Sequence, residues 1–355
     1  MVLKERLKAY ARSLGFDLIG VAAAGPTPSA DRYEEWVRAG RAATMAYLTR
    51  PDAIEKRRDI RNLWPEARSV IVVAMNYYAG DPPPPREDVP QGRVARYAWG
   101  EDYHEVLRER LEALLAFLNR EAGRPVRGRI YVDTGPVLER AWAVQAGLGW
   151  IGKNSMLIHP RLGSYLFLGI LLVDLELEPD PPFPTDHCGT CTRCIEACPT
   201  GCIRPDRTLE AERCLSYLTI ERREGIPTER RAAIGDWIFG CDICQEVCPW
   251  NRRFARPTAE PAFQPREGIP RLALAEVLRM DEEAFRARFR RSAIRRAKRR
   301  GLVRNALVVA GNLRARSLRP LLERWRADED PILQEHAAWA LERMEEAQVL
   351  LEGPG

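Results

Sequence analysis

Apolar and polar positions divide the chain into stretches with different patterns. Up to about residue 175, short apolar runs alternate with segments in which apolar residues recur every three or four positions. The apolar runs predict strands at 18–22, 70–75, 129–132 and 166–173, and the periodic segments predict helices at 3–14, 103–119 and 137–146. Because strands alternate with helices, we expect an α/β domain over residues 1–177.

Proline-rich segments separate this part from the rest. The segment Glu178–Pro184 (EPDPPFP) is stiff and predicts a linker, and prolines recur over 256–270. Beyond them the pattern is helical, with apolar residues at three- and four-residue steps over 305–313 and 335–344. Such helix pairs resemble HEAT repeats, of which two are too few to stand alone. We expect a middle domain over 178–256 and an all-α, HEAT-like domain over 257–355 that packs on the body of the protein.

Length and composition fit this division. A chain of 355 residues with 45% hydrophobic and 30% charged residues is typical of a soluble protein of two to three domains. Its longest apolar run, Tyr165–Val173, is too short to cross a membrane, and the first residues lack a signal-peptide core. We therefore expect a cytoplasmic protein with no membrane partner.

All nine cysteines lie between positions 188 and 248, which is typical of metal ligation in a reducing compartment. The run Cys188–Pro199 has the spacing C-x2-C-x2-C-x3-C-P of bacterial ferredoxins, whose fourth cysteine binds a second 4Fe-4S cluster. A second group, Cys241–Pro249, repeats the end of that pattern. Ile238 occupies the position where a symmetric ferredoxin has cysteine, and Cys214 is the only candidate to replace it.

This spacing predicts a ferredoxin-like domain with two clusters of four thiolates each. The first set is Cys188, Cys191, Cys194 and Cys248, and the second is Cys198, Cys214, Cys241 and Cys244. Zinc is the alternative for any single C-x2-C pair. Cys202 is left over and is expected to be a small buried residue, while His187 is expected beside the first ligand or at the surface.

Two fully ligated clusters move electrons but do no bond chemistry, so the first domain should hold a redox cofactor or substrate. Neither GxGxxG nor GxxxxGK[ST] occurs in the chain, which argues against a Rossmann or P-loop site. The fragment Asp102-Tyr-His104 matches the start of DxHxxG, a motif of cobalamin proteins, but Leu107 replaces the glycine, and a surface histidine is the simpler interpretation. Asp133 in VDTGP and the glycine-rich segment 147–155 are unusually polar for their surroundings, although turns and loops often carry such residues.

In combination, these motifs resemble those of the epoxyqueuosine reductase family, cobalamin- and iron-sulfur-dependent tRNA-modification enzymes. The resemblance extends over nearly the whole chain and is carried by ARYAWGEDYH (95–104), VDTGP (132–136), GWIGKN (149–154), the ferredoxin run and CLSY (214–217). It implies reduction of epoxyqueuosine to queuosine at the wobble position of tRNA with a GUN anticodon, the last step of queuosine biosynthesis, with loss of water. The clusters would pass electrons from an external donor to cobalamin in the first domain of a monomeric enzyme.

The resemblance also implies roles for individual residues. Asp133 would be the general acid, with a pKa raised by burial near the corrin. The expected cobalamin contacts are Arg57, Tyr97, Asp133, Lys153, Asn154 and Ser216.

The net charge of +5 conceals a strongly basic segment. Ten of the 19 residues from Arg286 to Arg304 are basic and none is acidic, so their mutual repulsion favours a polyanionic partner. We expect contacts to the tRNA phosphate backbone from Arg295, Arg296, Lys298, Arg299 and Arg300.

Two other functions fit part of the pattern. A cobalamin-dependent reductive dehalogenase would share the cofactors, but such enzymes are exported with a twin-arginine signal and lack a basic helical tail. A non-catalytic iron-sulfur electron carrier that binds nucleic acid would explain the cysteines and the tail, but it leaves Asp133 and the glycine-rich segment without a role.

Overall fold

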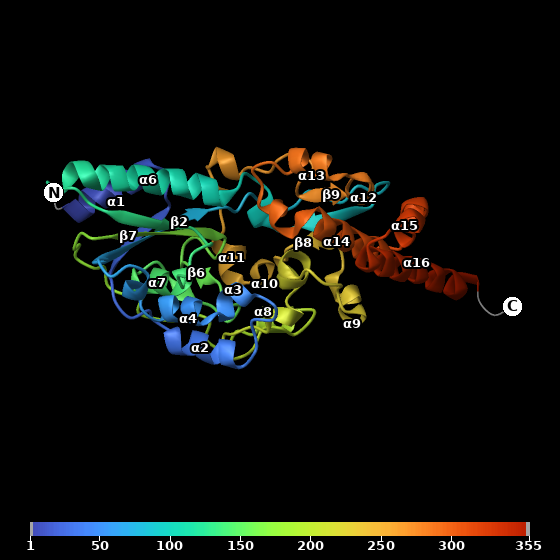
Figure 1. Cartoon of the computed structure of the whole chain (residues 1–355), viewed down its shortest axis with the longest axis horizontal. Helices are drawn as coiled ribbons and strands as arrows, with labels where there is room; N and C mark the ends of the chain where they lie inside the picture. The colour runs from blue at the N-terminus through green and yellow to red at the C-terminus, as the bar shows by residue number, and fades with distance from the viewer. Residues whose placement is uncertain (1–2, 353–355) are drawn as a thin grey trace.

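The computed structural model describes residues 3–352, with side chains for 3–346. Its larger sheet has the strand order β1 (Leu18–Ala23), β2 (Ser69–Asn76), β7 (Leu166–Val173) and β4 (Gly128–Tyr131). Helices α1 (Leu3–Ser13) and α6 (Tyr103–Glu121) cover one face, and α7 (Glu139–Gln145) packs on the other (Figure 1).

Alternation along the central strands explains why both faces are covered. In β2, Ile71 and Val73 belong to the same buried cluster as Leu107 of α6, while Val72 on the opposite face joins the cluster that contains Trp142 of α7. Successive side chains of a strand point to opposite faces, so a strand covered on both sides is apolar throughout. All eight residues of β2 and of β7 are buried accordingly.

The predicted strands and helices of this part occur at the expected places, but the α/β class is wrong. Every pairing in the larger sheet, β1 with β2, β2 with β7 and β7 with β4, is antiparallel. The arrangement is therefore α+β. Alternating helices and strands predict a parallel sheet only when parallel strands become neighbours. Here β2 and β4, on either side of α6 in the sequence, run in the same direction, but the antiparallel β7 lies between them.

A second, smaller sheet joins distant parts of the chain. Its central strand β3 (Gln91–Val94) pairs in parallel with β8 (Trp237–Phe239) and antiparallel with β9 (Arg271–Ala273). Each of the three predicted domains thus contributes one strand. The last segment is consequently not all-α as expected, because it contains β9.

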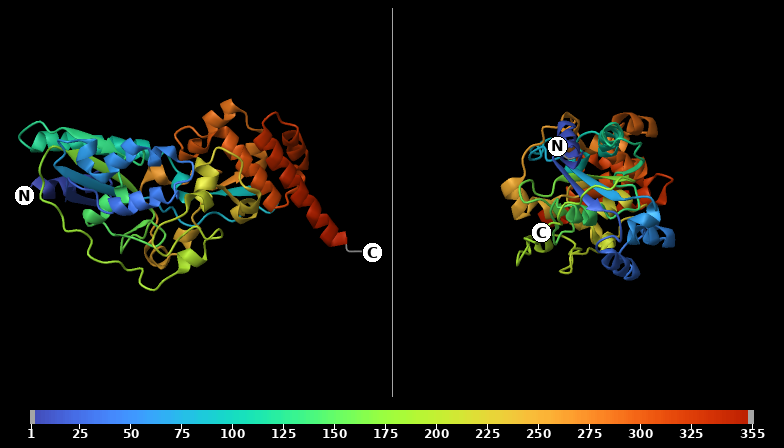
Figure 2. Two further views of the ribbon diagram at one scale, coloured as in Figure 1. Left: turned by 60° about the horizontal axis from the view of Figure 1, so that its bottom comes forward. Right: turned by 90° about the vertical axis from the view of Figure 1, so that its left-hand side faces the viewer.

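Helices form the far end of the molecule, where α16 projects from the body (Figure 2). They are α12 (Leu274–Arg279), α13 (Glu282–Arg288), α14 (Lys298–Asn312), α15 (Arg319–Arg326) and α16 (Pro331–Glu352). In α14 every residue from Leu302 to Gly311 is buried, because α12, α16 and β8 all pack against it. Asn305 in this helix donates hydrogen bonds to the carbonyl oxygens of Thr219 and Ile238, so the helical segment is fixed to the cysteine-bearing segment.

The remaining helices and strands are short and lie mainly around the cysteines and beside the larger sheet. They are α2 (Ala30–Arg38), α3 (Ala46–Thr49), α4 (Pro51–Arg58), α5 (Ile60–Leu63), β5 (Trp150–Ile151), β6 (Leu157–Ile158), α8 (Arg193–Glu196), α9 (Thr228–Arg231), α10 (Ile243–Glu246) and α11 (Pro249–Phe254). Among the described residues, none of the helices combines the length and apolar character needed to span a membrane.

Candidate active site

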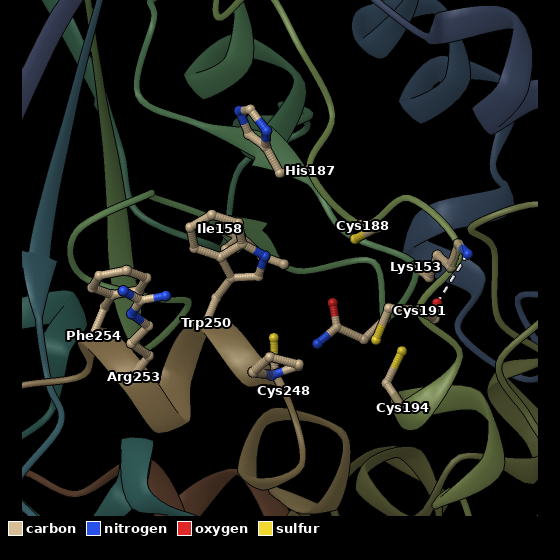
Figure 3. Close-up of a pocket in the computed structure, with 12 residues that line it drawn as sticks. Lys153, Ile158, His187, Cys188, Cys191, Cys194, Cys248, Trp250, Arg253 and Phe254 are labelled. Carbon is tan, nitrogen blue, oxygen red and sulfur yellow. Dashed lines mark hydrogen bonds between the residues drawn. The ribbon is translucent and has the colours of Figure 1, made fainter.

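Four cysteines from two distant segments line one cavity of about 340 Å³. Figure 3 shows their sulfur atoms around this space, together with Trp250 and Lys153. The four are Cys188, Cys191, Cys194 and Cys248, which are the residues of the first predicted set. A space lined by four thiols suits a 4Fe-4S cluster, since each iron takes one thiolate. His187, expected beside the first ligand, also lines the cavity, and its ring packs edge-on against Trp150 at 4.9 Å.

The cysteines of the second predicted set also lie close together. The thiolate charges of Cys214 and Cys198 both raise the pKa of the Cys241 thiol, after the larger effect of burial, and those of Cys241 and Cys214 act on Cys244 in the same way. Cys194 of the first set acts on Cys244 as well, so the two sets are neighbours.

The two departures from a symmetric ferredoxin have structural explanations. Ile238 is completely buried in β8, against Gly92 of β3, so this position serves the smaller sheet instead of a cluster. Cys202 is buried as expected, but it is not remote from the clusters. Its sulfur lies 3.4 Å from that of Cys198.

The glycine-rich segment holds both cysteine loops. Lys153 donates hydrogen bonds to the carbonyl oxygens of Gly189 at 2.7 Å and Cys191 at 2.9 Å. The buried Asn154 donates to the carbonyl oxygen of Cys244 at 3.4 Å. Both were expected to contact cobalamin. In the structure their side chains bind main-chain groups of the cysteine loops.

Asp133 lies in a tight turn that follows β4. Its backbone has φ +56°, a left-handed conformation that aspartate tolerates better than most residues. The turn is fixed by a hydrogen bond from the Asp133 N–H to Oε1 of Glu139 at 2.7 Å. The carboxylate remains 63% exposed, accepts a hydrogen bond from the Tyr103 hydroxyl at 2.9 Å, and lies 3.7 Å from Nε2 of His104.

The protonation of this group differs from the expectation. Desolvation tends to raise the pKa of Asp133, but the nearby imidazole of His104 and the hydrogen bond from Tyr103 outweigh it, and the pKa is lowered. Desolvation tends to lower the pKa of His104, yet its contacts with Asp102 and Asp133 raise it to about 9. The expected rise in the pKa of Asp133 depends on burial near the corrin and stays a prediction. The imidazole beside Asp133, which the sequence did not reveal, acts in the opposite direction.

The other expected cobalamin residues lie in different places. The Tyr97 ring packs 6.3 Å from that of Tyr103. It also lies near Gly240, the residue before Cys241, where a Cβ atom would come within 3.4 Å of the ring. Ser216 is half-exposed, two residues after Cys214. Arg57 is buried in α4, where its guanidinium lies over the Tyr33 ring at 5.5 Å.

The five expected tRNA contacts differ in what they bind. Arg296 forms two hydrogen bonds of 2.8 Å with Glu221, and Arg300 pairs with Asp330. Arg299 donates to the carbonyl oxygen of Met280 and is half-buried. Arg295 and Lys298 are exposed, and neither pairs with an acidic side chain among the described residues. Contrary to the expectation, acids from other segments compensate part of the basic run.

Sequence reasoning missed the groups around Asp133. His104 was interpreted as a surface histidine, but it is part-buried between Asp102 and Asp133. No sequence pattern marks Glu139, which holds the turn. The Asp102-x-His104 spacing was the available signal, because an aspartate at the start of a helix can reach a side chain two residues later.

Two family models and several relatives match the chain. A family model described as "Epoxyqueuosine reductase QueG, DUF1730" matches residues 57–134, and one described as "4Fe-4S double cluster binding domain" matches residues 187–251. The chain is 43% identical to epoxyqueuosine reductase from Cyclobacterium marinum over 304 residues, covering 84% of this chain and 94% of that protein. It is 41% identical to the Pseudomonas aeruginosa enzyme over 346 residues, covering 96% of this chain and 94% of that protein.

Solved structures agree. A crystal structure of epoxyqueuosine reductase with a tRNA-Tyr epoxyqueuosine-modified stem loop has a TM-score of 0.90 and 34% identity, covering 99% of this chain and 94% of that chain. The Bacillus subtilis enzyme, solved with an aspartate-bearing catalytic loop swung out of the active site, has a TM-score of 0.89 and 33% identity, covering 99% of this chain and 94% of that chain.

Proposed function

The chain belongs to the epoxyqueuosine reductase family, and on this premise we propose that it reduces epoxyqueuosine to queuosine at the wobble position of tRNA with a GUN anticodon. The observation that carries the proposal is the match to curated relatives over more than nine-tenths of their length. The family membership weighs against a reductive dehalogenase and against a non-catalytic carrier.

Two 4Fe-4S clusters supply the electrons, held by the two sets of four cysteines. We propose that the second set is the one nearer the reaction. Gly240 precedes Cys241 and lies near the Tyr97 ring, Tyr97 packs on Tyr103, and the Tyr103 hydroxyl donates a hydrogen bond to Asp133. An external electron donor would then reduce the clusters. We propose that the enzyme is a monomer.

Cobalamin, once reduced, supplies a strong nucleophile or electron donor toward the epoxide. The surroundings of Asp133 fit such a group in two respects. Asp133 is exposed while Tyr97 and Ser216 are partly exposed, so polar groups remain accessible to a ligand. Nε2 of His104 is buried and has no hydrogen-bond partner among the described residues, which marks a site whose polar contacts are incomplete. Lys153 and Asn154 would keep the cluster loops in place behind it, and Arg57 would contact the cofactor from α4.

Asp133 is the proposed general acid, which protonates the oxygen released from the epoxide. Its place in a tight turn supports this role, because the carboxylate on this turn is largely exposed and therefore accessible to a substrate. The related Bacillus subtilis enzyme has a catalytic loop that carries an aspartate and moves.

We place the domain boundaries at 1–177, 178–256 and 257–355. The last of these, the helical segment, would bind the tRNA. Arg295 and Lys298 are exposed without acidic partners among the described residues and are suited to phosphate contacts. The Arg296 guanidinium lies over the exposed Tyr47 ring at 5.6 Å. The pKa of Arg296 is raised chiefly by Glu221 and in part by Asp133, so the charge of the basic run interacts with that of the proposed acid.

The test is direct. Holoenzyme, prepared without oxygen and with both clusters and cobalamin, is incubated with an epoxyqueuosine-containing tRNA stem loop and a strong reductant, and nucleosides are analysed by mass. We expect queuosine to appear, with none formed when cobalamin is omitted. Failure of the complete mixture to form queuosine would overturn the proposal.

A further inference from the structure

Three side chains form a line of polar contacts that ends at the proposed acid. Asp102 caps the first turn of α6 and accepts a hydrogen bond from the His104 N–H at 3.1 Å. The same oxygen, Oδ1, lies 2.7 Å from Nδ1 of His104. On the other side of the ring, Nε2 lies 3.7 Å from Oδ2 of Asp133. The imidazole thus bridges two carboxylates from different segments.

The two ring nitrogens differ in an informative way. Nδ1 is bound to Asp102, so the ring is fixed in orientation. Nε2 is buried and lacks a hydrogen-bond partner within normal distance among the described residues. A buried donor without a partner is costly and is usually explained by function. The nearest acceptor that it faces is the Asp133 carboxylate, and a movement of less than ~1 Å would complete a hydrogen bond between them.

The resting protonation of this group does not suit an acid that works alone. The pKa of His104 is raised to about 9 and that of Asp133 is lowered. At neutral pH the proton therefore lies on the imidazole and Asp133 is a carboxylate. A general acid must carry the proton that it donates.

The proposed reaction also needs more protons than one carboxyl group carries. Conversion of an epoxide to an alkene and water breaks two C–O bonds and consumes two electrons and two protons. The clusters supply the electrons. Asp133 can hold one proton at a time, so it must be reprotonated within each turnover.

We propose that His104 is the proton reservoir of Asp133, an inference that rests on the proposed function. The Nε2–H bond of His104 breaks as an O–H bond forms on Oδ2 of Asp133, which then gives this proton to the substrate oxygen. The neutral imidazole is reprotonated from the solvent proton pool, and the transfer is repeated for the second proton. The Nδ1 proton stays on His104, hydrogen-bonded to Asp102, throughout. His104 therefore acts on the substrate only through Asp133, and Asp102 acts only by orienting His104.

Other groups near Asp133 are less suited to this role. Glu139 has a pKa raised to about 8 by burial and by the Asp133 charge, but its Oε1 accepts the main-chain N–H of Asp133 and does not face the carboxylate. The Tyr103 hydroxyl reaches Asp133, yet its pKa lies well above the ordinary value, so it stays neutral and gives up no proton. The charged and titratable groups that act on the pair or feel its charge are Asp102, Tyr103, Glu139, Arg140, Arg295, Arg296, Tyr47 and Tyr97.

The test compares His104→Gln with Glu139→Gln in full-length holoenzyme. Single-turnover rates are measured from about pH 5 to about pH 10 after the clusters have been reduced, so that electron supply is not limiting. For the unsubstituted enzyme we expect the rate to fall as pH rises through about 9, the pKa of His104. His104→Gln should be ~10- to 100-fold slower at neutral pH and lose this step, because Asp133 must then take its proton from water. Glu139→Gln keeps the acceptor for the Asp133 N–H and should keep the pH step.

A second measurement does not depend on turnover. Nitrogen-15 NMR of histidine-labelled protein without cobalamin gives the pKa of His104 directly. We expect a value near 9 that falls toward about 6.5 in Asp102→Asn and Asp133→Asn. Iron content and tRNA binding of each variant report on folding. An unshifted histidine, or a pH profile unchanged in His104→Gln, would overturn the relay. If the unsubstituted enzyme forms no queuosine, the proposed function fails, whereas the NMR result still tests the contact.

Discussion

The guanidinium of Arg304 donates a hydrogen bond of 2.6 Å to the carbonyl oxygen of Leu218 in the interior of the protein. Further hydrogen bonds go to the carbonyl oxygens of Arg222 and Glu224. Arg304 is the last residue of the basic run, and only 2% of it is exposed. The run therefore has two functions, because its end holds the helical segment to the cysteine segment while its exposed part remains available to a polyanion.

Substitution of Arg304 by alanine should destabilise the whole protein. Three main-chain carbonyl groups would lose their partner, at about 1–3 kcal/mol for each buried group left unsatisfied. We expect a thermal unfolding temperature lowered by several degrees or more, measured by calorimetry. Arg295→Ala, at an exposed position in the same run, is the control and should unfold like the unsubstituted protein.

The double substitution Arg295→Ala with Lys298→Ala should weaken tRNA binding. If both side chains neutralise phosphates, the slope of log Kd against log salt should fall by about 0.7–0.9 for each phosphate that is no longer neutralised. Fluorescence anisotropy with a stem loop at several salt concentrations measures it. Arg326→Ala removes an exposed cation of α15 that pairs with Glu323, and it should leave the slope unchanged. If the double variant has the same slope as the unsubstituted protein, Arg295 and Lys298 do not contact the tRNA phosphates.

Asp133→Asn should abolish most turnover while both clusters remain. The amide keeps the shape of the side chain but cannot donate a carboxyl proton, so we expect a rate at least ~100-fold lower. Nucleoside mass analysis gives the rate, and iron content checks the clusters. Asp52→Asn, at an exposed position of α4, is the matched control. Near-normal turnover in Asp133→Asn would exclude it as the acid.

Cys214→Ser should cost the protein one cluster, whereas Cys202→Ser should keep both. Cys214 replaces the ligand that Ile238 cannot provide, while Cys202 adjoins Cys198 at 3.4 Å without being needed for a set of four. Iron and sulfide analysis should give about half the normal content for the first variant and the full content for the second. The reverse result would show that Cys202, and not Cys214, is the cluster ligand.

His336 should make the protein less stable in mild acid. Its Nε2 accepts a hydrogen bond from the Ile226 N–H, and burial, followed by the Arg231 charge, lowers its pKa to about 3. Because the unfolded-state pKa is near 6.5, the stabilisation is complete above pH 6.5 and is lost at about 1.4 kcal/mol per pH unit as pH falls toward 3. In His336→Gln, chemical denaturation at about pH 7 and about pH 5 should show a smaller difference than in the unsubstituted protein.

Local sequence patterns predicted the structural features that depend on residues close together in the chain. They missed the features that depend on contacts between distant segments. The four strands of the larger sheet and the first cysteine set follow from local apolar runs and fixed ligand intervals. The antiparallel direction of the sheet, the acids that pair with Arg296 and Arg300, and the lowered pKa of Asp133 arise from residues far away in the sequence. His104 lay beside a recognised pattern, but its partner Asp133 is 29 positions later.

The smaller sheet constrains the order in which the protein can be completed. During synthesis β3 leaves the ribosome long before β8, and β8 before β9, so the central strand has both edges unpaired while most of the chain is still being made. An unpaired strand of this kind is prone to wrong partners. Chaperone occupancy at β3 should therefore persist until residue 273 has emerged.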